Sequence, residues 1–243
     1  MKKLLKSFKN EQEFRPTFLG ILVNPYFIVR YNILKGIKKL SLDFNGGRLL
    51  DFGCGSKPYK SYFKVDEYIG LDTHNSGHPI NDENIDVMYD GKKIPFDNNS
   101  FDYIFSSEVL EHVFDVNETI NEFNRVLKIN GKMIITSPFV WGEHEQPYDF
   151  ARYTSFGLKR ILEKNGFEVI QYIKSTTYIE TVFQNLTAYL YHSIIPKGLR
   201  ILLTLILVAP LNLFGIFLGK ILPEDKTFYL NNIILCKKIT NKK

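Results

Sequence analysis

A short apolar segment, residues 48–52, runs directly into the glycine pair Gly53 and Gly55. Glycines at such a turn let the backbone adopt positive φ angles and let a ligand approach closely. The free N–H groups of the loop, and of a helix that starts after it, favour a carboxylate or phosphate group. The segment therefore predicts a buried strand that ends in a ligand-binding loop, with a simple tight turn as the alternative.

From this segment onwards, apolar strands alternate with helices. We expect seven strands, at residues 48–52, 68–71, 85–88, 101–105, 132–136, 167–173 and 231–237. Helices are expected at 108–114, 118–127 and 155–165, with one or two more in the first 45 residues. Alternating strands and helices form a mostly parallel sheet that is covered on both faces. The predicted fold is a doubly wound α/β sheet.

An acidic residue, Asp72, ends the second expected strand. It lies about 20 residues after the glycine loop, where nucleotide-binding α/β folds place the acid that binds the ribose. The dinucleotide fingerprint would add a third glycine in the region where this chain has Lys57 and Pro58. This departure argues against a nicotinamide or flavin cofactor, and leaves a dinucleotide-dependent oxidoreductase as the weaker alternative.

A series of motifs follows the acidic residue along the chain: Asp90-Gly91, Ile94-Pro95-Phe96, the strand from Phe101, Val109-Leu110-Glu111-His112, and Arg125 to Lys132. As a set they resemble the class I S-adenosylmethionine-dependent methyltransferases. The similarity is to the type 11 group, which includes enzymes of ubiquinone and menaquinone biosynthesis. It covers roughly residues 46–173 and the last strand. The family usually has two glycines where Asn130-Gly131 stands, a mild departure at a turn.

The resemblance implies S-adenosylmethionine as the cofactor. The residues implied to bind it are Asp51, Gly53, Gly55, Asp72, Asp90, Gly91, Ser106, Ser107 and Glu108. Among these, Asp51 would orient the loop or meet the cofactor's amino group. Asp72 would bind the ribose hydroxyls, and Asp90 would accept a hydrogen bond from the adenine amine.

A polar loop, residues 141–154, follows the fifth expected strand, where such folds build substrate sites. It is similar to a run found in bacterial methyltransferases near surface-glycan genes. His144 is the candidate general base, with a role in stabilising the loop as the alternative. The candidate substrate contacts are Trp141, Tyr148, Arg152 and Tyr153. Arg152 has a second interpretation, because it can instead hold the loop through Asp149 or Glu145.

Glu108, Glu111 and His112 are closely spaced in the sequence. A similar arrangement in ubiquinone-pathway O-methyltransferases is associated with a divalent metal. Related proteins without a metal have Glu-His at the same place, so we expect no metal here and keep these three ligands as the alternative.

One segment departs from the α/β pattern: residues 201–219 carry no charge and are mostly Leu, Ile, Val and Phe. Its length is about that of a membrane span, but a single crossing would separate the last strand from its sheet. We expect a break at Pro210 into two helices that pack on residues 18–37. They either form a buried cap or dock on the inner membrane, with Lys197, Arg200 and Lys220 at the headgroups.

The chain carries a net charge of +5, and lysines gather at its two ends: Lys2, Lys3, Lys6, Lys9, Lys237, Lys238, Lys242 and Lys243. They indicate either solvated tails or attraction to an anionic surface. No nucleic-acid motif is present, so we expect no nucleic-acid partner.

The two cysteines are far apart in the sequence, which suits a protein of the reducing cytoplasm, with a position on the inner membrane face as the alternative. The oligomeric state is not readable.

The sequence thus predicts four parts: a helical segment (1–45), a cofactor-binding core (46–177), a hydrophobic insertion (178–226), and the last strand with a basic tail (227–243). The predicted activity is methylation of an oxygen on a small, lipid-linked or glycan-linked acceptor. The alternative from another class is a membrane-associated S-adenosylmethionine-binding protein without catalysis.

Overall fold

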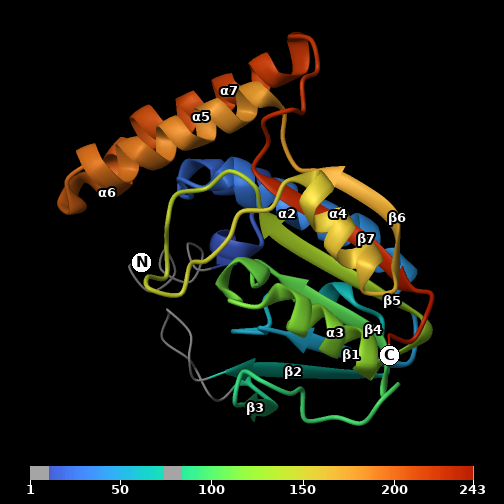
Figure 1. Ribbon diagram of the computed structural model, residues 1–243. Coiled ribbons are helices and arrows are strands. Elements are labelled where there is room, and N and C mark those ends of the chain that lie inside the picture. Colours follow the sequence, from blue (N-terminus) through green and yellow to red (C-terminus); the bar gives the residue numbers. More distant parts are fainter. Residues whose placement is uncertain (1–10, 74–83, 243) are drawn as a thin grey trace. The chain divides into compact units, whose positions relative to one another are not determined.

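The computed structural model describes residues 11–73 and 84–242 (Figure 1). Four lysines at the start of the chain and Lys243, counted above as basic ends, lie outside the described residues. The described chain forms two compact units: 11–36 with Lys174–Asn231, and Ile37–Ile173 with residues 232–242. The N-terminal segment and the hydrophobic insertion, which the sequence analysis treats separately, therefore belong to one unit. We call this the helical unit, and the other the catalytic unit.

A seven-stranded sheet has the order β3-β2-β1-β4-β5-β7-β6. Its strands are β1 (Arg48–Phe52), β2 (Glu67–Thr73), β3 (Val87–Tyr89), β4 (Phe101–Ser107), β5 (Leu127–Pro138), β6 (Phe167–Lys174) and β7 (Asn231–Lys238). β1 pairs in parallel with β2 and β4, β2 with β3, and β4 with β5. Later strands are therefore added on both sides of the central β1, which confirms the predicted doubly wound fold.

One expected helix is not formed in the structure. The segment expected as a helix at 108–114 contains only a short 3-10 turn, η5 (Leu110–His112). Glu108 has a φ of 56°, outside the right-handed helical region, so no α-helix can run through it. The following helix, α3 (Val116–Val126), ends before Asn130-Gly131, which lies inside β5.

The core of the catalytic unit lies between the strands and the helices α3 and α4 (Ser155–Lys164). Asp115 caps α3 by accepting from the backbone N–H of Asn117 and Glu118, and Thr154 caps α4. Both helices present an apolar face, a pattern that buries best against a sheet. The fully buried members of this core include Leu50, Ile104, Ile120, Phe123, Met133, Leu158 and Leu162.

Aromatic side chains form a second cluster within the same unit. Phe44 stacks on Tyr103 of β4 with ring centroids 4.4 Å apart, and Phe63 lies 4.8 Å from Phe105. The 3-10 turns η2 (Ser41–Asp43) and η3 (Lys60–Tyr62) come just before Phe44 and Phe63. Because side chains alternate along a strand, β4 contributes Ile104 to the first cluster and its neighbours Tyr103 and Phe105 to the second.

The basic tail is a correction to the sequence analysis. Lys238 is fully buried, and its Nζ donates to the backbone carbonyls of Asn124 and Leu127, at 2.5 and 2.7 Å. Lys242 donates to the side chain of Asn165. Lys238 therefore neutralises no external anion; it satisfies carbonyls at the junction of α3 and β5.

The helical unit contains η1 (Phe18–Leu22), most of α2 (Phe27–Leu40), α5 (Tyr178–Tyr189) and a longer helix from Lys197 to Ile221. That helix consists of a 3-10 turn, α6 (Arg200–Leu203), the π-helical turn η8 (Thr204–Val208) and α7 (Ala209–Ile221). The expected break at Pro210 is wrong. Pro210 lies in the first turn of α7, directly after the π-helical turn, where a missing N–H is tolerated. α5 and α7 pack side by side (Figure 1).

Candidate active site

The predicted ligand loop follows β1 at the carboxyl edge of the sheet. Gly53 has a φ of 72°, its N–H donates to the carbonyl of Leu71, and a Cβ there would lie 2.4 Å from the side chain of Val109. Any larger residue would therefore clash as well as strain the backbone. Gly55 has a φ of 47°, and a Cβ on it would meet nothing within 4 Å. The loop thus borders open space at Gly55, as a ligand loop requires.

Asp51 is buried at the end of β1, and its Oδ2 accepts a 2.5 Å hydrogen bond from the hydroxyl of Tyr68. Burial raises the pKa of Asp51 to about 7. A bound cation such as an amino group would favour its charged form. Sequence reasoning missed Tyr68, whose only signal was its place on the neighbouring strand β2.

Asp72 and Asp90 stand at the ends of adjacent strands. Asp72 lies in β2, is buried, and accepts from the N–H of Gly55 at 2.8 Å, so it fixes the glycine loop. Asp90 follows β3 directly, is exposed, and accepts from the N–H of Lys92; its neighbour Gly91 has a φ of 81°. The parallel register pairs Asp72 with Met88, so the two carboxylates belong to the same edge. Their contacts with ribose and adenine stay predictions.

The end of β4 supplies the next group of predicted residues. Ser106 is fully buried, and its Oγ has no hydrogen-bond partner among the described residues. Ser107 pairs with Thr136 of β5, their hydroxyl oxygens 2.9 Å apart, and Thr136 also donates to Glu108 Oε1 at 2.7 Å. Thr136, which sequence reasoning missed, therefore fixes Glu108 at the mouth of the site.

Loop 141–154 is held by an internal ion pair. Arg152 donates to both carboxylate oxygens of Asp149, at 2.5 and 2.7 Å, and to the carbonyls of Trp141 and Gly142. The Arg152 hydrogen bond lowers the pKa of Asp149 to about 2. Asp149 also accepts from the backbone N–H of His144. These contacts support the loop-holding role of Arg152; its contact with substrate stays a prediction.

The same loop is fastened to the turn η5. The N–H groups of Phe150 and Ala151 donate to the carbonyl of Glu111, and the hydroxyl of Tyr153 donates to the carbonyl of Leu110. Tyr148 is 38% exposed and offers its carbonyl to His112. Among the predicted substrate residues, Tyr148 thus presents its ring to solvent, while Trp141 and Tyr153 are partly buried.

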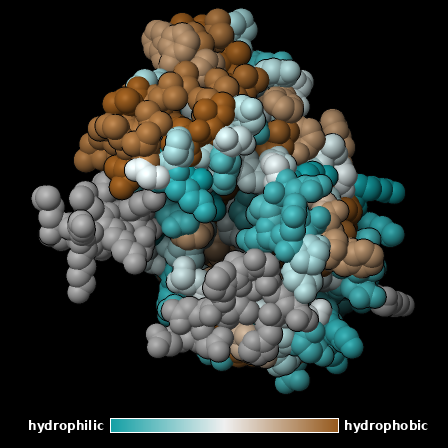
Figure 2. Space-filling view, turned by 90° about the vertical axis from the view of Figure 1, so that its left-hand side faces the viewer, coloured by the Kyte–Doolittle hydropathy of each residue, from teal (hydrophilic) through white to brown (hydrophobic). Residues whose placement is uncertain are grey.

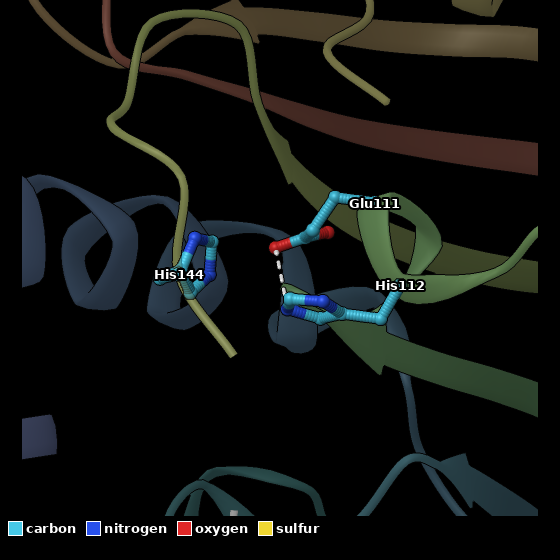
Figure 3. A group of neighbouring side chains, drawn as sticks. All are labelled: Glu111, His112 and His144. Atoms are coloured by element: carbon cyan, nitrogen blue, oxygen red, sulfur yellow. Dashed lines mark ion pairs between the residues drawn. The ribbon is translucent and has the colours of Figure 1, made fainter. Parts of the chain in front are cut away.

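This fastening brings together Glu111, His112 and His144, which come from η5 and from the loop (Figure 3). One ligand atom from each lies within 4.8 Å of the others. The Glu111 carboxylate points toward the two imidazoles; it is fully buried, and neither oxygen has a hydrogen-bond partner among the described residues. Burial, and then the charge of Glu108, raise the pKa of Glu111 well above its usual range. The sequence alone did not join His144 to this cluster.

The ring nitrogens of the two histidines have polar neighbours. Nδ1 of His112 lies 2.6 Å from the carbonyl of Tyr148, to which only a protonated Nδ1 can donate. Nδ1 of His144 lies between an acceptor, the carbonyl of Gly142 at 3.2 Å, and a donor, Nη2 of Arg152 at 3.4 Å. Burial, and then His112, lower the pKa of His144 from 6.5. His144 is therefore neutral at pH 7 and able to accept a proton.

The cluster also has the donor set of a divalent metal site: two imidazole nitrogens and a carboxylate, with N–H groups held by carbonyls. Tetrahedral zinc at its usual ligand distances would bring the three donor atoms to about 3.3 Å from one another. The cluster would need to contract from its present 4.8 Å span to reach that geometry. Compared with the predicted set, His144 takes the place of Glu108, which is bonded to Thr136.

A family model described as a methyltransferase domain matches residues 28–172. The chain is a member of this methyltransferase family. Membership of this family supports the methyltransferase prediction over a dinucleotide-dependent oxidoreductase, and S-adenosylmethionine stays the cofactor that the class I resemblance implies. The residues present fit this cofactor: open space borders Gly55, Asp72 ends β2, and Ser106 offers an unpartnered buried hydroxyl.

Similarity to known proteins covers part of the chain in sequence and most of it in fold. Phosphoethanolamine N-methyltransferase 2 of Caenorhabditis elegans is 29% identical over 92 residues, which are 38% of this chain but only 20% of that protein. The Haemonchus contortus phosphoethanolamine N-methyltransferase 2, solved with S-adenosyl-L-methionine, is 18% identical with a TM-score of 0.54, covering 96% of this chain and 60% of that one. An S-adenosylmethionine-dependent methyltransferase from Mesorhizobium loti is 13% identical with a TM-score of 0.50, covering 87% and 98%.

Proposed function

We propose that the methyltransferase methylates an oxygen of a small, lipid-linked or glycan-linked acceptor that binds against loop 141–154. The observation that carries this proposal is His144, whose pKa is lowered by burial and whose imidazole lies in the cluster with Glu111 and His112. A hydroxyl is a poor nucleophile until its proton is removed, and a positioned histidine of lowered pKa suits that task.

The proposed chemistry assigns each group a task. When bound, S-adenosylmethionine supplies a methyl group on a sulfonium that needs no further activation. Asp51, Asp72 and the glycine loop hold the cofactor so that the acceptor oxygen, methyl carbon and sulfur lie in line. As the oxygen–carbon bond forms, the sulfur would keep the electron pair of the broken bond, and the imidazole of His144 would take the acceptor proton.

A second acceptor chemistry draws support from the two phosphoethanolamine N-methyltransferases that this chain resembles. An amine acceptor is protonated at neutral pH, so it also needs a base before it can attack a methyl group. His144 would then take the proton from an ammonium group in place of a hydroxyl. We rank this acceptor second because the curated match covers only 20% of that protein.

An isotope-labelled cofactor distinguishes methylation of an oxygen from methylation of an amine. The purified enzyme would be incubated with methyl-labelled S-adenosylmethionine and, separately, with a membrane-lipid extract, a glycan extract and phosphoethanolamine. Label in an ether or ester of a lipid or glycan supports the O-methylation proposal. Label on phosphoethanolamine nitrogen, with none on oxygen, would overturn it.

His144→Asn tests the base, because the amide keeps a hydrogen-bonding group but accepts no proton near pH 7. Turnover should fall by about a hundredfold or more, while cofactor affinity stays unchanged. Wild-type turnover should rise with pH through an apparent pKa below 6.5 and then level off, since only neutral His144 accepts a proton. The variant should lose that acidic limb of the pH profile.

His192→Ala, at a histidine that pairs with Tyr26 in the helical unit, serves as the control. Equal turnover in wild type and His144→Asn would return His144 to a structural role.

The metal alternative has its own readout. If Glu111, His112 and His144 held a required divalent ion, EDTA would abolish turnover and added zinc or magnesium would restore it. The base mechanism predicts turnover that EDTA does not change.

We also propose that the reaction takes place in the cytoplasm. Cys54 and Cys236 support this, since both are free buried thiols that suit a reducing compartment. Fractionation of cells into cytoplasmic and extracellular pools tests this proposal.

A further inference from the structure

The outer faces of the two packed helices, α5 and the helix from Lys197 to Ile221, are apolar. We call the pair the hairpin. Exposed apolar and tyrosine side chains recur along α5 at three- and four-residue spacing, and along the longer helix at similar spacing. They include Tyr178, Val182, Leu186, Tyr189, Ile201, Leu202, Leu205, Ile206, Leu213, Phe214, Phe217 and Ile221. Figure 2 shows hydrophobic residues gathered in one broad area. Single exposed hydrophobics are common in soluble proteins, but a contiguous surface of this kind marks a binding face.

The buried residues of the hairpin include polar and small ones as well as the apolar Val208. Gln184 and Thr187 of α5, and Asn212 of α7, are all fully buried. Thr187 accepts from Gln184 Nε2 at 3.2 Å and lies 3.1 Å from Asn212 Oδ1, to which it donates. Gly215 packs so closely that a Cβ would lie 2.5 Å from Phe183. The bond between Thr187 and Asn212 therefore joins α5 to α7, together with the close contact at Gly215 and the rings of Phe183 and Phe214, 5.6 Å apart. Gln184 bonds within α5 and to the N-terminal segment.

This distribution is the reverse of that in a water-soluble helix pair, which buries its large apolar residues between the helices. Helices in a lipid bilayer pack through small residues and interhelical hydrogen bonds, and they expose Leu, Ile and Phe to the lipid. The reason is that the hydrophobic effect does not favour pairing of large apolar faces in lipid. The longer helix is 25 residues long, and only 28% of its most apolar stretch is buried. A core helix of a soluble protein would be mostly buried.

The charges of the hairpin indicate which lipid it meets. Residues 181–219 contain no Asp or Glu, and their two strongly basic residues are Lys197 and Arg200, beside the connection between the helices. Lys220 follows at the far end of the longer helix. Basic residues at the ends of an apolar segment reach toward anionic headgroups, and tyrosines such as Tyr189 prefer the same interface.

A protein partner fits these observations less well. Protein interfaces place a polar, often charged rim around an apolar centre. Apart from Glu180 in the first turn of α5, the hairpin has no acidic residue, and polar side chains are buried in it although its exterior is apolar. In a dimer of this chain, both copies would contribute the same uncharged surface, so neither would supply the charged rim of a protein interface.

We infer that the hairpin is a lipid-binding device, which inserts its outer apolar face into a bilayer that contains anionic lipid. β6 and β7, which flank the hairpin in the chain, are neighbours in one sheet, so both ends of the hairpin stay on the same side of the membrane. This inference goes beyond the proposed function: it names a partner surface, and it holds whichever acceptor receives the methyl group.

Vesicle flotation of the full chain tests the inference. The vesicles contain phosphatidylcholine alone or with phosphatidylglycerol. Wild-type protein should float with both, and more strongly with phosphatidylglycerol. The double variant Ile206→Glu/Phe217→Glu puts two carboxylates on one face of the longer helix, and its partition coefficient should fall at least about tenfold. The double variant Lys197→Gln/Lys220→Gln should lose the preference for phosphatidylglycerol.

The control places the same two glutamates at exposed apolar positions of the catalytic unit, Leu42→Glu/Phe156→Glu, and should float like the wild type. Cofactor binding and helical content, measured on every variant, identify a folding failure, and neither readout depends on the acceptor. Wild-type protein that does not float would overturn the inference, as would hairpin and control variants that lose flotation equally. A wild type that stays in solution as a dimer, with a monomeric hairpin variant, would assign the surface to a second copy.

Discussion

In the catalytic unit, the largest buried side chains between sheet and helices are apolar, Phe123 of α3 among them, and polar groups gather at the carboxyl edge of the strands. In the hairpin the fully buried side chains include Gln184 and Asn212, while Phe217 is 55% exposed. In the hairpin, polar residues are thus buried and large apolar ones exposed, the opposite of the core of the catalytic unit. Burial of apolar area stabilises a structure only where water is the alternative environment, so the difference indicates two different solvents.

The largest effect expected from this comparison comes from truncating one phenylalanine in each unit. Phe123→Ala removes a fully buried ring, and should lower the free energy of unfolding by about 3–5 kcal/mol. Phe217→Ala should change it by less than about 0.5 kcal/mol in water, yet weaken binding to vesicles. Denaturant titration with and without vesicles measures both. Equal destabilisation by the two variants in water would break the comparison, since it would place Phe217 in a water-excluding core.

A smaller effect should follow from a change at the polar edge of the catalytic unit. Asp72→Ala removes the acceptor for the Gly55 N–H and the proposed contact with the ribose, and should weaken cofactor binding by about 1.5–3 kcal/mol. Isothermal titration calorimetry with S-adenosylhomocysteine gives the affinity. Asp102→Ala, at a carboxylate that pairs with Lys128 at the opposite end of β4, is the control. Unchanged affinity in Asp72→Ala would contradict the assigned cofactor contact.

The smallest effect concerns the polar interior of the hairpin. Thr187→Val keeps the shape of the side chain but removes the hydroxyl between Gln184 and Asn212, and should destabilise the helix pair by about 1–2 kcal/mol. Thr187→Ser keeps the hydroxyl and should largely preserve the pair. Hydrogen exchange of the α5 and α7 amides in lipid reports the local opening. A valine variant with slower exchange than wild type would show that the interior favours apolar packing, as in water.

Much of the catalytic unit could be predicted from residue order. The strand β1 has the bounds that its apolar run predicted, and the seven strands were all expected, because short apolar runs bounded by turn residues are local signals. The turn η5 could not be predicted in the same way. Its apolar spacing suits a helix, but Glu108 adopts a positive φ, and Thr136 on another strand bonds both its backbone and its side chain.

The sequence by itself determined the class of protein and its predicted cofactor loop. The alternation of strands and helices, the glycine pair and the acids that follow it are all local features of the sequence. Only the tertiary structure decided that His144 joins Glu111 and His112, which lie more than thirty positions earlier. It alone decided that Lys238 is buried and that Pro210 leaves its helix unbroken. The physical reason is that contacts between residues far apart in the sequence determine which groups lie next to one another, and no local pattern of residues encodes these contacts.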